Sequence, residues 1–88
     1  MNNFSNIKDT IVEISVLLPV NIQNHIIELL NEDEFNIAFE ELCCYLFEYD
    51  KQVTNNCYES IVNIGNYLRV DNSYWEPLLA LVIKPQTT

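Results

Sequence analysis

Apolar residues between Glu34 and Tyr49 recur at the spacing of an amphipathic helix. Five of them share one helical face, at intervals of three and four residues: Phe35, Ala38, Phe39, Leu42 and Leu46. Glu34, Glu41 and Glu48 recur every seven residues, which places them in a nearly straight row beside that face. The pattern predicts a helix with an apolar face and an acidic outer strip.

Two interpretations of the acidic strip are open, because Ile37 and Cys44 lie among its glutamates. A central helix packed on more than one side would bury such residues. Alternatively, the strip is a docking surface for a basic protein. In that case the predicted partner-binding residues are Glu34, Ile37, Glu40, Glu41, Cys44, Tyr45, Glu48, Tyr49 and Asp50. Tyr45 and Tyr49 stand four residues apart at the edge of the strip, as half-buried scaffold or as anchors for a partner.

A first helix is predicted near Asn3 to Leu18. Its inward face would consist of Phe4, Ile7, Ile11, Ile14 and Leu18. The apolar residues from Val12 to Leu18 also alternate as in a strand, but no second convincing strand exists to pair with them. We therefore expect a helix that ends at Pro19.

A second helix is expected after Pro19, with Asn21 as its N-cap. The inward residues would be Ile22, Ile26, Leu29 and Leu30. Residues Asn31 to Asp33 would form the turn into the acidic helix. The carboxylates of residues 32–34 would then lie at the positive end of that helix, where negative charge is favourable.

A polar loop is expected from Asp50 to Asn55, followed by a fourth helix. Asn56 and Glu59 have the spacing of a capping box. The inward face would consist of Tyr58, Ile61, Val62, Gly65 and Leu68. Gly65 is the only glycine, and we expect it to permit close approach of another helix.

A fifth segment would begin at a second capping box, Ser73 with Glu76, and would tolerate Pro77 in its first turn. It carries the apolar residues Trp75, Leu78, Leu79 and Val82. Lys84 and Pro85 would close the fold. The sequence therefore predicts an all-α fold, a compact bundle of about five short helices. It would form a single domain over residues 1–88, with 84–88 as a tail.

Composition narrows the classes of partner. The 88 residues contain 13 acidic and 4 basic side chains, for a net charge of −9. Such a field repels nucleic acid and anionic membranes and favours a basic protein partner. Acidity kept only for solubility is the alternative. The N-terminal residues lack the pattern of a secretory signal, and the longest apolar blocks are too short for a membrane span, so we expect a cytoplasmic protein.

Catalytic and metal-binding patterns are missing. His25 is the only histidine, and Glu28 nearby does not complete a ligand set. Three cysteines, two of them adjacent, predict neither a disulfide framework nor a zinc site, so we expect reduced and largely buried thiols. A nucleophilic pair of Cys57 and His25 stays open as an alternative, although nothing local activates either residue. We expect a non-enzyme without cofactor or metal.

Several of these segments together resemble the MafI-type immunity proteins. The resemblance rests on residues 34–43 (EFNIAFEELC) and 46–50 (LFEYD), on Tyr58, Ile61 and Gly65, and on residues 74–78 (YWEPL). It covers residues 22 to 82, and the combination is more specific than any single piece. This sequence departs from the family at residues 31–33, where members usually have a glycine.

The resemblance implies a small, acidic, helical cytoplasmic protein that protects its own cell from a toxin of competing bacteria. The toxins of this family are often ribonucleases of the EndoU type. This protein would bind such a toxin domain as a monomer and occlude its basic substrate-binding surface. An acidic helical adaptor for an amphipathic helix of an unrelated partner is the alternative function, and binding insensitive to salt would favour it.

Overall fold

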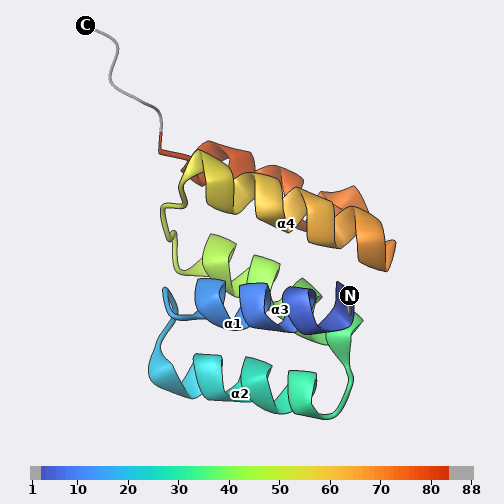
Figure 1. Ribbon diagram of the computed structural model, residues 1–88. Helices are drawn as coiled ribbons and strands as arrows, with labels where there is room; N and C mark the ends of the chain where they lie inside the picture. Colours follow the sequence, from blue (N-terminus) through green and yellow to red (C-terminus); the bar gives the residue numbers. More distant parts are fainter. Residues whose placement is uncertain (1–2, 84–88) are drawn as a thin grey trace, which may run out of the picture.

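Four α-helices and two 3₁₀ helices form the computed structural model, which describes the backbone of residues 3–83 and the side chains from Asn6 onward (Figure 1). Their order is α1 (Asn3–Ser15), α2 (Val20–Asn31), α3 (Phe35–Glu48), α4 (Asn55–Leu68), η1 (Asn72–Tyr74) and η2 (Glu76–Leu81). Residues 3–83 contain no β-strand, so the predicted all-α bundle is confirmed. The fifth predicted segment, however, consists of two short 3₁₀ helices rather than one α-helix.

Helix α3 is the centre of the bundle and contacts every other element. In Figure 1, α1 lies in front of α3, with α2 below them and α4 above. The side chains that α3 buries are Ala38, Phe39, Leu42, Cys43 and Leu46. The predicted apolar face is therefore confirmed, with Phe35 half-buried at its N-terminal end and Cys43 added to it.

The other helices bury part of each predicted face. In α1, α2 and α4 the buried residues of these faces are Ile7, Ile11, Ile14, Ile26, Leu30, Ile61 and Gly65. The remaining members of these faces are half-buried against the core: Ile22, Leu29, Tyr58, Val62 and Leu68. Ile64 of α4 is also buried, which was not predicted. Phe4 lies outside the described side chains. The alternation near Val12 belongs to a helix, because burial there follows the helical spacing of Ile11 and Ile14.

The junction between α1 and α2 differs from the prediction. Helix α1 ends at Ser15, and a turn follows in which the Leu18 N–H donates to the Ser15 carbonyl at 2.9 Å. Pro19, not Asn21, is the N-cap residue of α2, and its carbonyl accepts the Gln23 N–H at 2.9 Å. The Pro19 ring fixes φ at −54°, and no side chain caps the free N–H groups of the first turn of α2.

The start of α4 also differs from the prediction, because Thr54 caps it instead of Asn56 with Glu59. The Thr54 hydroxyl accepts the Cys57 backbone N–H at 3.0 Å. The preceding loop is not entirely polar, since Val53 is 1% exposed. Its N–H donates to the Leu81 carbonyl and its carbonyl accepts the Ile83 N–H, at 3.0 and 2.8 Å. These two bonds attach the end of η2 to the α3–α4 loop.

The predicted capping box of Ser73 with Glu76 is wrong. The Ser73 backbone N–H donates to the Asp71 carboxylate at 2.8 Å, so Asp71 caps η1. In η2, Leu78 is fully buried, but Leu79 is 58% exposed and does not face the core. Trp75, between the two 3₁₀ helices, is only 4% exposed and is a core residue. Residues 84–88, the predicted tail, lie outside the described residues.

Three helices end on residues in the left-handed conformation without using glycine. Asp33, Asp50 and Arg69 have φ of 60°, 56° and 59°. After each, the next N–H reaches back five residues to a carbonyl of the last turn, as in Glu34 N–H to Leu29 O at 2.9 Å. Aspartate tolerates this conformation better than most residues. Asp33 therefore closes α2 without a glycine.

The indole ring of Trp75 packs directly against Gly65. A Cβ at this position would lie 2.1 Å from Cζ3 of Trp75. The indole in turn meets the Phe39 ring edge-on, with centroids 6.1 Å apart and planes at 64°. The predicted close approach at Gly65 is thus made by the Trp75 side chain, not by another helix.

Candidate functional site

The nine predicted partner-binding residues all retain solvent exposure on or beside the outer side of α3; we call them the acidic surface. Ile37, Cys44 and Glu48 are exposed, and the helical rotation of 100° per residue places them within one narrow sector. Glu40 and Glu41 are half-buried on its two flanks. Helix α3 packs on several sides, but that packing leaves Ile37 and Cys44 exposed rather than buried. The docking surface for a basic protein stays a prediction.

A hydrogen bond joins the N-terminal end of α3 to the end of α4. Near the start of α3, the Asn36 side-chain amide donates to the Leu68 carbonyl at the end of α4, at 3.0 Å. Glu34, the N-cap residue, is exposed and makes no side-chain capping bond. Its carboxylate therefore projects into solvent next to the positive end of the helix.

The electrostatic field of the surface acts on Cys44. Partial burial raises the pKa of the Cys44 thiol above its ordinary value, and the carboxylates of Glu40, Glu41 and Glu48 raise it further. Helix α3 contains no lysine or arginine to offset them. At neutral pH Cys44 is therefore a neutral thiol in an acidic surrounding, and the thiolate that nucleophilic chemistry needs is disfavoured.

Glu41 has a partner on the neighbouring helix. The Nε2 atom of His25 in α2 lies 2.9 Å from Oε2 of Glu41, and both side chains are partly exposed. When the imidazole is protonated, this contact is an ion pair. The prediction missed it, although both residues stand eight positions from Asp33 in the turn, which is where an antiparallel helix pair brings residues together.

The two tyrosines of the surface differ in role. Their rings lie 6.2 Å apart with planes at 32°, as their four-residue spacing predicts. Tyr45 packs against the core, whereas Tyr49 is 44% exposed at the C-cap of α3. Asp50 follows in the left-handed turn and is exposed. Tyr45 is thus mainly scaffold, and Tyr49 is the ring that is available to a partner.

Phe47 is an exposed aromatic residue that the prediction left out of the surface. It is 55% exposed, more than Ile37 or Tyr49. The sequence contained a signal, because position 47 lies off the core face defined by Phe39 and Leu46. A large exposed ring beside carboxylates adds apolar area to the acidic surface.

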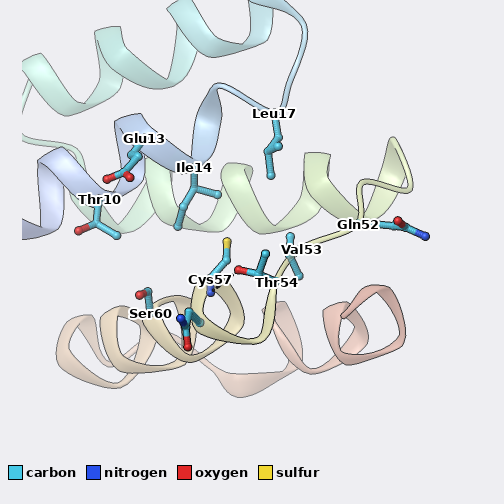
Figure 2. A pocket seen from close by; sticks show the side chains of 10 residues that line it. Thr10, Glu13, Ile14, Leu17, Gln52, Val53, Thr54, Cys57 and Ser60 are labelled. Atoms are coloured by element: carbon cyan, nitrogen blue, oxygen red, sulfur yellow. Dashed lines mark hydrogen bonds between the residues drawn. The ribbon is translucent and has the colours of Figure 1, made fainter. Parts of the chain in front are cut away.

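The structure does not bring Cys57 and His25 together as a catalytic pair. His25 contacts Glu41, whereas Cys57 lies on α4 beside Thr10 and Glu13 of α1 (Figure 2). Burial raises the pKa of the Cys57 thiol, and the Glu13 carboxylate raises it further. Burial likewise raises the pKa of the fully buried Cys43. The cysteines are free, but only Cys43 is buried; Cys57 is half-buried and Cys44 is exposed, contrary to the expectation of largely buried thiols.

No group of three or more histidine, cysteine, aspartate or glutamate side chains in the described part of the chain could hold a metal ion. Among residues 3–83, no helix has the length and apolar character needed to cross a membrane.

Comparisons with protein families, with curated proteins and with solved structures give no match to this chain. The interpretation of the acidic surface therefore depends on its own residues and on the sequence resemblance stated above.

Proposed function

We propose that this protein is an immunity protein that binds a bacterial nuclease toxin, of the EndoU ribonuclease type, and occludes its basic substrate-binding surface. The observation that carries the proposal is the exposed acidic surface on α3. It combines five carboxylates with exposed apolar and aromatic side chains, and α3 offers no basic residue. The resemblance to MafI-type immunity proteins supports the same function.

A ribonuclease must attract polyanionic RNA, so the surface around its active cleft is basic. An inhibitor with a concentrated negative field is drawn to that same surface, which speeds the encounter. Binding there excludes RNA sterically and electrostatically. The protein would act as a monomer, one molecule per toxin, without catalysis and without a cofactor, in the cytoplasm where the RNA substrate is found.

Affinity in such a complex would come from a few desolvated contacts rather than from charges at the rim. Ile37, Phe47 and Tyr49 are the exposed large apolar side chains of α3 and its C-cap. They lie on a helix whose opposite face is fixed in the core, so little side-chain and backbone order would be lost on binding. The carboxylates would then set the rate of association and the apolar groups the rate of dissociation.

Charge reversal at Glu48 tests the proposal most directly. Glu48 is exposed and has no described hydrogen bond, whereas reversal of Glu41 would also break the contact with His25. Glu48→Lys should leave the unfolding free energy within about 1 kcal/mol of wild type. Association with the purified toxin domain should slow by about tenfold at low salt, with a much smaller change in dissociation.

Glu59→Lys is the matched control, because Glu59 is also an exposed glutamate but lies on α4. Both variants change the net charge equally, so a local interface predicts a larger effect at position 48 than at 59. Wild-type protein should also abolish RNA cleavage at a one-to-one ratio, and added salt should slow its association. Equal effects of the two reversals, or binding kinetics insensitive to salt, would contradict an interface at the acidic surface.

A further inference from the structure

A groove runs along the seam between α1 and α4, on a part of the surface that α3 does not line. Its widest section has a volume of about 390 Å³ and lies between Glu13, Ile14 and Leu17 on one side and Val53 and Cys57 on the other (Figure 2). Two shallower hollows of about 200 and 260 Å³ continue it toward the other end of the seam, as far as Tyr67. Neighbouring hollows share lining residues, so the three form one continuous groove.

Small polar residues account for the hollow. Thr10 on α1 and Ser60 and Asn63 on α4 line the seam where larger side chains would be needed to close it. Between them the floor is apolar, because Ile7, Ile14 and Ile64 reach the groove and are each 6–7% exposed. The groove follows α1 from residue 6 to its end at Ser15, roughly 14 Å or about two and a half helical turns, and reaches Leu17 in the turn beyond.

Leu17, in the turn after α1, lines the wide end of the groove and is 42% exposed. Its neighbour in the chain, Val16, is 65% exposed. Leu17 therefore extends the apolar lining of the groove toward solvent.

The charge of the groove is negative. Of the described residues that line its three sections, Glu13 alone carries a formal charge. The Cys57 sulfur points from α4 toward α1 in this section and serves as a small apolar lining group (Figure 2). A partner that fills the groove must therefore place apolar groups along the floor, and it gains from a positive charge beside Glu13. A second copy of this chain, with its net charge of −9, fits this requirement poorly.

We propose that the α1–α4 groove binds an amphipathic helix of about three turns from a protein partner, with a lysine or arginine beside Glu13. The apolar side chains of that helix, spaced three and four residues apart, would lie over the isoleucine floor, and the last of them would meet Leu17. This surface is separate from the acidic surface, so the inference does not rest on the proposed nuclease inhibition.

Synthetic helical peptides of fourteen residues test the proposal on the full-length protein. Each peptide carries leucines at helical spacing and one lysine, whose position varies through the series. Backbone amide shifts of the isotope-labelled protein report where a peptide binds. We expect saturable shifts at Thr10, Ser60 and Asn63, and none on the outer side of α3. Absence of saturable binding throughout the series, or shifts centred on the acidic surface, would overturn the proposal.

A charge exchange makes the test specific. Glu13→Lys should lower the affinity for the best lysine peptide by about tenfold. It should raise the affinity for the same peptide with glutamate in place of lysine. Glu48→Lys, the same charge change on α3, should alter both affinities by less than about twofold, as expected for screened charges at a distance. Ser60→Trp, checked for an unchanged circular dichroism spectrum, should fill the groove and abolish binding. Equal effects of the reversals at 13 and 48 would show that no lysine binds beside Glu13.

Discussion

Gly65→Ala should destabilise the protein even though alanine is the better helix former. The new Cβ would lie 2.1 Å from Cζ3 and 2.5 Å from Cε3 of Trp75, far inside van der Waals contact. The indole has little room to retreat, because it is 4% exposed and packs edge-on against the fully buried Phe39. The strain must therefore be shared by the core.

The size of the effect follows from two opposing contributions. Alanine gains about 1 kcal/mol over glycine inside a helix. Overpacking a core costs about 1–3 kcal/mol, and a backbone-fixed methyl group against a confined ring belongs at the upper end. We expect the unfolding free energy to fall by about 2 kcal/mol, which is a large share of the stability of a small domain.

The variant Trp75→Leu isolates the cause, because it removes the ring but keeps an apolar side chain. In that background Gly65→Ala should stabilise the protein by about 1 kcal/mol through helix propensity alone. The change from a loss of about 2 to a gain of about 1 gives a coupling energy of about 3 kcal/mol. Urea unfolding followed by circular dichroism measures all four proteins, since the only tryptophan is lost in two of them. A stabilised single variant Gly65→Ala, or an equal effect in both backgrounds, would refute the reasoning.

Three further predictions concern a cap, the core and a thiol. Thr54→Ala should cost about 1 kcal/mol of stability by removing the α4 cap, and Thr54→Ser should restore most of it in thermal unfolding. Leu42→Ala should lower the free energy of unfolding by about 2–5 kcal/mol, measured in urea. Ile37→Ala, at a 45% exposed position of the same helix, should lower it far less. Iodoacetamide should modify Cys44 slowly at pH 8, faster as the pH rises through its raised pKa, and faster in Glu40→Gln, because the thiolate reacts and Glu40 disfavours it. Mass spectrometry of the modified peptide would show an unchanged rate in Glu40→Gln if that carboxylate does not act on the thiol.

Helical periodicity predicted the core because burial in this protein follows local spacing. The faces that contain Ile11, Ile26 and Leu42 are the faces that pack. The exposed side of α3 followed from the same spacing, so the residues of the acidic surface could be predicted. The contacts of each residue could not be predicted from spacing alone. The exception is a pair on either side of a short turn, such as His25 and Glu41, where the geometry is simple.

The predicted caps failed because several residues near each helix start can serve as caps. Thr54, Asn55 and Asn56 are all competent, and the choice depends on where the chain enters the helix. That entry is fixed by hydrogen bonds between Val53 and the segment 81–83, which is distant in sequence. The α1–α4 groove was hidden for a similar reason. It depends on how two helices about 40 residues apart lie against α3, and no local pattern encodes that.

The division of α3 into a buried and an exposed face determines how experiments on function must be interpreted. Helix α3 contacts every other element, so a core change such as Leu42→Ala would lower the folded population. If the protein acts as proposed, protection would fall with it. The exposed face contributes little to folding, so under the same proposal Glu48→Lys would reduce protection by slowing association with the toxin. Both variants could thus produce the same loss in a cell. Only paired measurements of unfolding free energy and association rate separate them, and a loss of capture at unchanged stability would be specific to the acidic surface.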